Sequence, residues 1–581
     1  MTERSARRFC GTMALILLAT LFYLLVLDVK AFGATRYVSK SGSDANGGTS
    51  WSDAWLTVNK VNTTVVGGDT VFFGTGIWRE QLRPIEGSYA DRTTYACSSF
   101  ALTNGSGQYH FAQFYGSDQL TTWTRIGTGN TYRTNYTPSD VNDNLWQGDS
   151  IMYLQVDSAS VNSVGKWWAG NGHVVAWVYG GDDPDNYDME ITVIGRGYCV
   201  VNTTRSYAQN PTNPGGQDHV TLWGLAVKYG CYYGIGNESD YPRGYDSVFI
   251  EHCLVNNISG FYGENPAGIY TAKAEDYADE EQTPDAASYN RIRACSLGTC
   301  IALYPAPQRE DGAHGEAVCV YSWNKSVIDS CVFFGRQTRS QVYLKVSDPT
   351  PTGAFAWNEY DTIRYNKFDC TKSGFWDVNS GQTGHDGIFY NFTRGIDIFD
   401  KGRHIEIYGN IFISSNSYVS GVDIFNSVAA NLGKGYVNIF NNTFYNFAGA
   451  FGQGCDEPAC TPLLHNQAKY NVFVRTSSTS STASLDSTQF WDSVDSNMYY
   501  TSSGSLTWYG NGSSRTWSQW QALGMDVHSS NDVDPGLAAD FSRSATGEMN
   551  RTYGGKTWTI YGAWQPTAGT TTKRFLVRKP Q

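Results

Sequence analysis

The stretch IRYNKF, residues 363–368, returns as IYGNIF at 407–412 and as IFNNTF at 439–444. Each copy has an apolar residue, an Asn three positions later and a Phe two positions after that. Five further copies keep the spacing with other residues at the three positions: LWGLAV (222–227), IEHCLV (250–255), IRACSL (292–297), IDSCVF (328–333) and AKYNVF (468–473). The intervals run from 28 to 44 residues. A recurring phrase at uneven intervals predicts a solenoid whose loops differ in length from turn to turn.

We expect the central position of this phrase at a corner between two short strands. Asn tolerates a left-handed backbone, and stacked Asn amides can hydrogen-bond from one turn to the next. Cys replaces Asn at three consecutive corners, Cys253, Cys295 and Cys331, where we expect small buried thiols and not disulfides. Because helical patterns are scarce, we predict an all-β protein whose main body is a parallel β-helix.

The composition excludes one class of partner. The chain has 581 residues, a net charge of −12, 17% charged residues and 14% aromatic residues. This acidic balance argues against nucleic acid, whose phosphates need basic patches on the protein. The 38 Tyr and 18 Trp residues could face sugar rings, although most are expected to pack within a large β fold.

The N-terminus predicts export. MTERSARRF is basic, GTMALILLATLFYLLVLDV is apolar, and AFGA supplies the small residues of a cleavage site. We therefore expect residues 1–34 to be a signal peptide, with an uncleaved anchor as the alternative, and a secreted, cell-surface or periplasmic protein that does not contact a membrane after cleavage. Twelve cysteines fit an oxidising compartment, and Cys295/Cys300 and Cys455/Cys460 could bridge short loops. No Cys/His spacing predicts zinc.

Three regions of the chain resemble right-handed parallel β-helix proteins of the pectate-lyase-like superfamily. Residues 37–80 (YVSKSGSDANGGTSWSDAWLTVNKVNTTVVGGDTVFFGTGIWRE) resemble their N-terminal cap, and residues 165–186 (GKWWAGNGHVVAWVYGGDDPDN) are similar to a β-rich insertion of carbohydrate-active members. TWSQWQALGMDVHSS (516–530), DPG (534–536) and YGAWQ (561–565) resemble their C-terminal ending. The resemblance implies a right-handed β-helix, but the superfamily contains lyases, hydrolases, epimerases and non-catalytic proteins.

The domain organisation follows from the repeat and the resemblance together. We predict an N-terminal cap with the first turns at 35–96, an inserted β-rich module at 97–205, the parallel β-helix at 206–475 and a capping region at 476–581. Capping is expected because an open terminal turn would expose an unpaired sheet edge. Nothing in the C-terminal region predicts chemistry.

A second repeat points to a site. GIDIF at 395–399 returns as GVDIF at 421–425, one turn later, which places Asp397 and Asp423 outward in one column with Phe399 and Phe425 beside them. The preceding turn, QVYLKV, places Tyr343 above Asp397 and Lys345 above Phe399. An alternative register uses Phe375–Val378 as the strand and puts Trp376 in the Asp423 column.

Stacked carboxylates need a partner. Two of them about 5 Å apart repel by roughly 3 kcal/mol at an effective dielectric constant near 20, so a shared proton, a bound cation or Lys345 must relieve the pair. A raised pKa on one Asp would supply a general acid beside an ionised partner, as in a glycosidase. A bound cation, with Lys345 as the base, would suit a lyase. A pair of solvated surface aspartates remains the structural alternative.

Weaker candidates complete the site. Asp400 ends the GIDIF strand, and His385 with Asp386 lies in the loop before it. Tyr270 and Tyr304 join Tyr343, Trp376, Phe399 and Phe425 as a candidate sugar platform. No metal site is predicted with certainty; the acidic loop at 273–285 could hold Ca²⁺.

The predicted partner is a polysaccharide or oligosaccharide. We expect a glycoside hydrolase using Asp397 and Asp423, ahead of a Ca²⁺-dependent polysaccharide lyase. A non-catalytic glycan-binding or surface-structural β-helix protein is the alternative from another class. The glycan, its linkage and the oligomeric state do not follow from the sequence.

Overall fold

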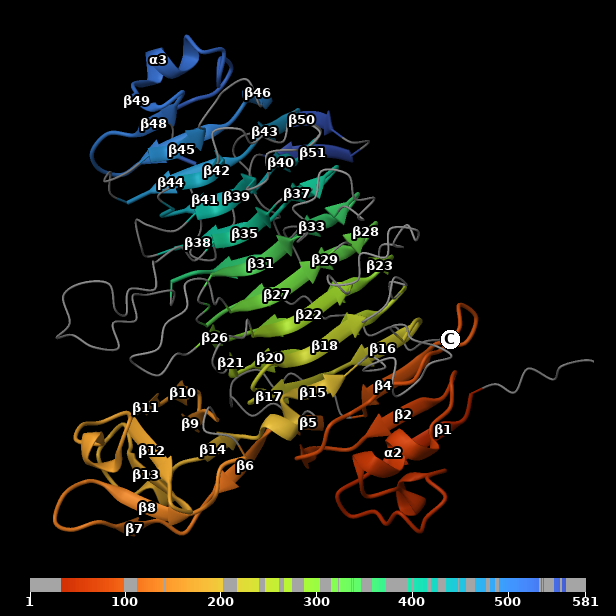
Figure 1. The fold of residues 1–581 in the computed structure, drawn as a ribbon. Coiled ribbons are helices and arrows are strands. Elements are labelled where there is room, and N and C mark those ends of the chain that lie inside the picture. Colours follow the sequence, from red (N-terminus) through yellow and green to blue (C-terminus); the bar gives the residue numbers. More distant parts are fainter. Residues whose placement is uncertain are drawn as a thin grey trace, which may run out of the picture.

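The protein is a right-handed parallel β-helix, as predicted (Figure 1). The computed structural model describes residues 33–98, 112–139, 143–201, 217–239, 246–260, 266–273, 287–302, 315–321, 323–335, 337, 339–345, 358–371, 394–399, 402–414, 420–426, 435–447, 449–455, 465–476, 481–485, 491–531, 534–535, 537, 548–553 and 556–560. Three long sheets, named A, B and C here, form the walls of the solenoid. Figure 1 shows their strands stacked from the N-terminal cap at the bottom to α3 (Trp517–Gln521) at the top.

Each wall is a ladder of short strands from successive turns. Sheet A contains, in spatial order, β1 (Thr35–Val38), β2 (Thr70–Phe73), β4 (Thr93–Cys97), β16 (Val220–Trp223), β19 (Phe249–Glu251), β24 (Arg291–Arg293), β29 (Val327–Asp329), β33 (Thr362–Arg364), β37 (Glu406–Tyr408), β40 (Asn438–Phe440), β43 (Asn466–Lys469) and β46 (Trp491–Asp495). Sheet B contains β3 (Gly76–Trp78), β5 (Ala112–Tyr115), β17 (Leu225–Lys228), β20 (Leu254–Asn256), β25 (Ser296–Leu297), β30 (Val332–Phe333), β34 (Lys367–Asp369), β38 (Ile411–Ile413), β41 (Thr443–Tyr445), β44 (Val472–Arg475) and β47 (Met498–Thr501).

Sheet C forms the third wall. It contains β15 (Tyr198–Val201), β18 (Tyr233–Ser239), β22 (Ala267–Lys273), β27 (Glu316–Tyr321), β31 (Ser340–Lys345), β35 (Arg394–Phe399), β39 (Ser420–Asn426), β42 (Gly449–Cys455), β45 (Ser481–Leu485), β48 (Thr507–Gly510) and β49 (Ser513–Arg515). Its neighbours are parallel except for the last pair, where β49 turns back antiparallel on β48. Shorter ladders join β23 (Ala287–Ser288), β28 (Trp323–Asn324), β32 (Asn358–Glu359) and β36 (Gly402–Arg403), and β21 (Ile258–Gly260) with β26 (Cys300–Ala302).

The repeated phrase sets the register of sheets A and B. Its first position lies on sheet A, where Ile328 pairs with Ile363 and Ile363 with Ile407. Its last position lies on sheet B, where aromatic rings stack inside the solenoid with centroids 4.6–5.1 Å apart, in the order Phe333, Phe368, Phe412, Phe444, Phe473 and Tyr499. These apolar side chains are buried, so the core is a continuous column and not a series of separate domains.

The Asn corner forms the predicted amide ladder. Side-chain Nδ2 groups donate to the next Oδ1 at 3.0–3.1 Å along the series Asn366, Asn410, Asn442, Asn471 and Asn497. The ladder is longer than the repeated phrase indicates, because Asn497 continues it. One detail of the prediction is wrong. The left-handed residue is the one before the Asn, such as Tyr365 (φ 56°) or Gly409 (φ 65°), because the side-chain amide is needed to bridge the turns and not to permit the bend.

The cysteines that replace Asn behave as buried thiols. Cys253, Cys295 and Cys331 are free and buried, and burial raises the pKa of Cys253 and Cys295 well above the ordinary value. The suggested bridge between Cys295 and Cys300 is wrong: both are free, and their Sγ atoms donate to the carbonyls of Ile250 and Pro266. The suggested pair at 455 and 460 lies outside the described side chains.

Both ends of the solenoid are covered. At the N-terminal end, α2 (Val58–Thr64) buries Val58 and Val61 against the core. At the C-terminal end, the buried Asp526 accepts hydrogen bonds from Asn497 Nδ2 at 2.9 Å and Trp520 Nε1 at 2.8 Å. The amide ladder therefore ends on a carboxylate that also fixes α3. A separate hairpin joins β50 (Glu548–Tyr553) to β51 (Lys556–Ile560).

A β-rich module is inserted between β5 and β15. It is built from β6 (Ser117–Leu120), β7 (Thr124–Arg125), β8 (Tyr132–Asn135), β9 (Leu145–Gln147), β10 (Ser150–Ile151), β11 (Tyr153–Leu154), β12 (Lys166–Gly170), β13 (His173–Trp177) and β14 (Met189–Thr192). These strands form a four-stranded and a five-stranded sheet at the lower left of Figure 1. The interval 97–205 therefore also holds β5 and β15, which pair with solenoid strands, and solenoid strands extend beyond 206–475 at both ends.

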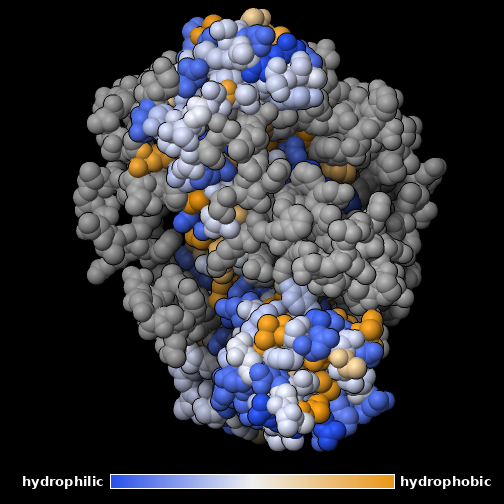
Figure 2. Space-filling model, turned by 90° about the vertical axis from the view of Figure 1, so that its left-hand side faces the viewer, coloured by the Kyte–Doolittle hydropathy of each residue, from blue (hydrophilic) through white to orange (hydrophobic). Residues whose placement is uncertain are grey.

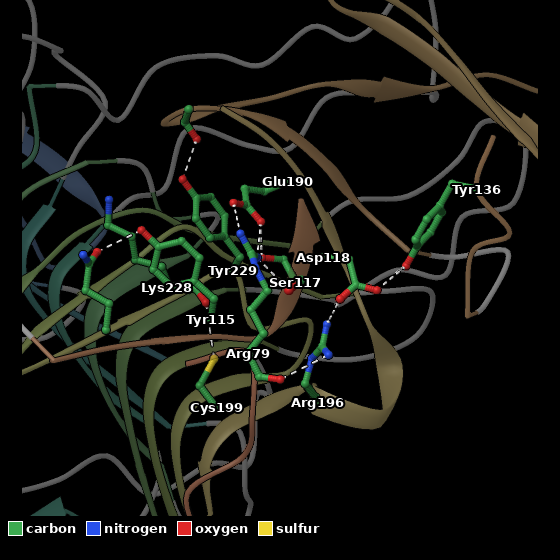
Figure 3. A network of polar contacts seen from close by, with 12 residues as sticks. Arg79, Tyr115, Ser117, Asp118, Tyr136, Glu190, Arg196, Cys199, Lys228 and Tyr229 are labelled. Atoms are coloured by element: carbon green, nitrogen blue, oxygen red, sulfur yellow. Dashed lines mark hydrogen bonds and ion pairs between the residues drawn. The ribbon is translucent and has the colours of Figure 1, made fainter. Parts of the chain in front are cut away.

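Charged groups fasten the module to the solenoid (Figure 3). Arg79 makes two hydrogen bonds to Glu190 of β14, at 2.6 and 2.7 Å, and Ser117 Oγ donates to the same carboxylate at 2.7 Å. Arg196 pairs with Asp118, which also accepts from Tyr136 at 2.9 Å. Because Glu190 is only 3% exposed, this junction is expected to be rigid.

The surface at the two ends of the molecule is mixed in character. Figure 2 shows hydrophobic residues interrupting the hydrophilic surface of the described parts at the lower end. Within the described part of the chain, no helix is long and apolar enough to cross a membrane. The predicted signal segment lies outside the described residues.

Candidate active site on sheet C

Three neighbouring strands of sheet C bring the predicted residues together. In the register of β31 and β35, Tyr343 lies opposite Asp397 and Lys345 opposite Phe399. In the register of β35 and β39, Asp397 lies opposite Asp423. The alternating Ile396, Ile398, Val422 and Ile424 are buried in the core. The predicted register is confirmed, and the alternative is wrong, because β35 itself occupies the place between β31 and β39.

The two aspartates share one arginine. Arg394, the first residue of β35, donates from Nη1 to Asp397 Oδ2 at 2.6 Å and lies with Nε 2.7 Å from Asp423 Oδ2. Neighbouring strands are about 4.8 Å apart, so the Nη1 and Nε atoms of one guanidinium can each reach a carboxylate on a different strand. Burial alone would lower the pKa of Arg394, but Asp397 and Asp423 raise it above the ordinary value. The repulsion expected between the carboxylates is thus relieved by an arginine.

A second arginine closes the other side of Asp397. Arg339 Nε lies 3.0 Å from Asp397 Oδ2, and its Cζ is 4.2 Å from the centre of the Tyr343 ring. Burial lowers the pKa of Arg339, yet Tyr343, Asp397 and Glu316 raise it overall. Burial also raises the pKa of Tyr343 well above its usual value, although Arg339 opposes this effect. The Tyr343 phenol therefore remains protonated at neutral pH.

Exposure separates the two carboxylates. Asp397 and Tyr343 are 0% exposed, whereas the Asp423 side chain is 15% exposed. Asp397 Oδ1 is buried without a hydrogen-bond partner among the described residues. Asp423 is therefore the more accessible carboxylate of the pair, and Asp397, opposite it on the neighbouring strand, pairs with both arginines.

Aromatic side chains continue this face toward the N-terminal end of sheet C. Tyr233 and Tyr270 stack with centroids 3.9 Å apart and an interplanar angle of 3°. Tyr270 meets Tyr321 edge to face at 5.7 Å, and Tyr343 meets Phe399 in the same way at 5.9 Å. We call this row the aromatic strip; Tyr270 and Phe399 are its partly buried members. Tyr343 is fully buried, so its predicted place in the sugar platform is wrong, and Tyr270 and Phe399 are the rings of the strip that could support sugar rings beside the carboxylates.

Lys345 lies one column away from the aspartates. Its Nζ is 5.5 Å from the centre of the Tyr321 ring, and within the described residues it makes no ion pair with either aspartate. It is the third cation on this face, beside Arg339 and Arg394. Its predicted role as a neutralising or basic group stays a prediction.

Several predicted residues cannot be placed. Asp400, His385, Asp386, Trp376 and Tyr304 lie outside the described residues, as does the side chain of Phe425. The acidic loop proposed for Ca²⁺ also lies almost entirely outside them. Among the residues that the structure describes, no group of three or more His, Cys, Asp or Glu side chains is arranged to hold a metal ion.

The two arginines are the residues that sequence reasoning missed. Both follow a Thr just before a strand of the site, in TRSQVYLK (338–345) and TRGIDIF (393–399). Arg394 N donates to Arg339 O at 2.9 Å, so the two Thr-Arg pairs begin neighbouring turns. This third repeat was the available signal, and the charge of a stacked aspartate pair was the physical reason to look for it.

Comparisons with known proteins show the fold alone. No model of a protein family matches the chain, and no curated protein does. Among solved structures, the chain is similar to XylC in complex with xylose, with 14% identity, 87% of each chain covered and a TM-score of 0.50. It is also similar to a protein described as a glycoside hydrolase (8% identity, 78% of this chain and 94% of that chain, TM-score 0.45) and to pectate lyase Pel9A (13% identity, 92% and 97%, TM-score 0.42). The predicted resemblance to right-handed parallel β-helix proteins is confirmed.

Proposed function

We propose that this chain is a secreted, polysaccharide-active enzyme that hydrolyses glycosidic bonds on the outer face of sheet C. The observation that carries the proposal is the in-register pair Asp397 and Asp423, bridged by Arg394 beside the aromatic strip. Similarity to proteins described as a glycoside hydrolase and a pectate lyase supports a carbohydrate substrate, at the level of the shared fold.

The geometry suits two-carboxylate chemistry. Retaining glycosidases hold their carboxyl groups about 5–5.5 Å apart, close to the spacing of neighbouring strands. In such a reaction one carboxylate attacks the anomeric carbon while the other carboxyl group, in its protonated form, donates its proton to the departing oxygen; it then takes a proton from the water that releases the sugar. We assign the attack on the sugar to Asp423, because its side chain retains exposure, and the partner role to Asp397.

A polysaccharide lyase is the second candidate. Arg339 and Arg394 pair with the aspartates and Lys345 lies one column away, so this face has three cations that would suit the carboxylate of a uronate substrate. In that reading Lys345 removes the proton beside the uronate carboxylate, and a Ca²⁺ ion could assist. A non-catalytic glycan binder would need only the aromatic strip.

One experiment separates these readings. Residues 35–581 are incubated with neutral and acidic polysaccharides while reducing ends and the ultraviolet absorbance of unsaturated uronates are recorded together. Reducing ends without absorbance are the expected result. Both signals together, lost on adding a chelator, would favour the lyase. Binding without either signal across the panel would contradict an enzymatic function for those substrates and favour the binder.

The same assay tests whether both Asp397 and Asp423 take part in the chemistry. Equal losses of turnover in Asp397→Asn and Asp423→Asn would assign both carboxylates to chemistry. A much smaller loss in Asp397→Asn would make it a positioning residue for the arginines. The secreted location is checked by sequencing the N-terminus of the exported protein, with cleavage expected near Gly33 or Ala34.

A further inference from the structure

The C-terminal cap contains a pocket of about 650 Å³ that lies away from the strands of the candidate active site. It is formed by the end of β47, the β48–β49 hairpin and the start of α3, and described residues line it. Its volume falls within the range of roughly 300–1,000 Å³ typical of small-molecule sites. No chemistry was predicted for this end from the sequence.

One side of the pocket is aromatic. Trp508 and Trp517 pack with ring centroids 4.8 Å apart and an interplanar angle of 48°, and Tyr500 and Leu506 extend this wall. Trp508 is only 1% exposed, whereas Trp517 is half-buried and available to a ligand. A flat, partly exposed indole is suited to the C–H face of a sugar ring.

The remaining lining is rich in hydroxyl and amide groups. These polar residues are Thr501, Ser505, Thr507, Ser514, Thr516, Gln519 and Asn531. Thr516 and Gln519 already form the capping box of α3, and Thr501 Oγ1 donates to Ser503 O. The other hydroxyl and amide groups can donate and accept hydrogen bonds, which matches a ligand that carries several hydroxyl groups. None of the residues that line the pocket is acidic.

Arg515 gives the pocket its charge. Its Nε donates to Gly510 O at 3.2 Å, which fixes the side chain across the β48–β49 hairpin. Its two terminal nitrogens make no hydrogen bond or ion pair with the described residues. A guanidinium held in this way presents a planar fork that fits a carboxylate through two hydrogen bonds.

We propose that this pocket is a second, non-catalytic carbohydrate site that binds a uronic acid residue. The indole of Trp517 supports the ring, Arg515 receives the carboxylate, and the surrounding hydroxyl and amide groups contact the ring hydroxyls. The proposal deepens the proposed function, because it names the acidic sugar class that the same protein would hold at its C-terminal end.

Binding of two matched sugars tests the proposal. Glucuronic acid and glucose share one ring and differ in the carboxylate, and their binding to the full chain is followed by saturation-transfer NMR and titration calorimetry. We expect saturable binding of glucuronic acid with a Kd of about 1 mM, which corresponds to a binding free energy of roughly −4 kcal/mol. Glucose should bind at least tenfold more weakly. Trp517→Leu and Arg515→Gln should each weaken glucuronic acid binding at least tenfold.

A tryptophan at the opposite end serves as the matched control. Trp51 is 46% exposed in the N-terminal cap, so Trp51→Leu should leave the affinity within about twofold. If Trp517→Leu lowers the melting temperature, the two Arg515 variants still test the proposal. Arg515→Gln removes the positive charge, and Arg515→Lys keeps the charge but loses the planar guanidinium. Equal affinity for both sugars, affinity unchanged in Arg515→Gln, or no saturable binding would overturn the proposal.

The test also separates this site from the candidate active site. Asp423→Asn should lose turnover while it keeps its affinity for glucuronic acid. Loss of that affinity in Asp423→Asn, with Arg515→Gln unaffected, would place the sugar on sheet C and overturn the proposal. A full chain without turnover that still binds glucuronic acid through Arg515 would contradict only the enzymatic function.

Discussion

Two columns of stacked polar side chains run along this solenoid, and they are stabilised in different ways. At the corner between sheets A and B, each Asn amide donates to one neighbour and accepts from the other, so the column stabilises itself. On sheet C, Asp397 and Asp423 can only accept, and they are stacked only because Arg394 and Arg339 lie between and beside them. A self-complementary column needs no further explanation than stability. A column of like charges held together by two arginines is the arrangement on which the proposed function rests.

The largest loss of stability is expected when a carboxylate replaces an amide in the Asn column. Asn410 is 0% exposed, and its Nδ2 donates to Ile363 O and Asn442 Oδ1 at 2.9 and 3.0 Å. In Asn410→Asp both donors are lost and a charge is buried without a cation, so we expect about 4 kcal/mol of destabilisation or failure to fold. Thermal unfolding measures this change. Asn59→Asp, at an exposed position on α2, is the control, and equal melting temperatures in the two variants would contradict the account.

A smaller effect is expected when the aspartates lose their shared cation. Arg394→Gln removes the cation that bridges Asp397 and Asp423 and leaves Arg339 beside Asp397, and we expect about 3 kcal/mol of destabilisation. The matched control is Arg364→Gln on sheet A, whose pair with Asp329 at 3.2 Å is more exposed and should contribute less than about 1 kcal/mol. Similar shifts in melting temperature for both variants would mean that the sheet C pair is an ordinary surface contact.

The last effect is one that depends on pH, and it concerns a buried carboxyl that belongs to neither column. Burial raises the pKa of Asp361 well above 3.8, although the hydrogen bond from Ser326 N opposes this. Above pH 3.8 the unfolded form releases a proton that the folded form keeps, so this group costs stability as the pH rises, by up to about 1.4 kcal/mol per pH unit until the folded pKa is reached. Asp361→Asn cannot ionise, so its melting temperature relative to the wild type should increase from pH 4 to pH 8. A difference that stays constant with pH would contradict this assignment.

Much of the fold could be predicted from the sequence, because successive turns of the solenoid share one residue pattern. The phrase with Ile363, Asn366 and Phe368 recurs at each turn, and its spacing alone indicates two inward positions and a corner. The left-handed residue before the Asn could not be predicted in the same way, because Tyr365, Gly409 and Asn441 have no side-chain type in common. Backbone conformation there follows from the ladder on either side.

The candidate site could be predicted only in part. The register of Asp397 and Asp423 follows from two copies of one phrase, and the structure confirms it. Arg394 begins β35 and Arg339 directly precedes β31, so both lie at the ends of their strands, where side-chain direction does not follow from period two. The pocket around Trp517 depends on how a hairpin and a short helix meet, for which the sequence contains no repeat.

The most direct test of the central claim is the turnover of Asp423→Asn on a polysaccharide that the wild type cleaves. We expect kcat to fall by at least about 10³-fold, because the Asn amide cannot replace the carboxylate that attacks the sugar, while binding of the polysaccharide is retained. Asp492→Asn is the control, because Asp492 is an exposed aspartate on β46 paired with His465 and should leave kcat unchanged. Wild-type turnover in Asp423→Asn would contradict the account, because the stacked carboxylates would then be a structural feature of sheet C.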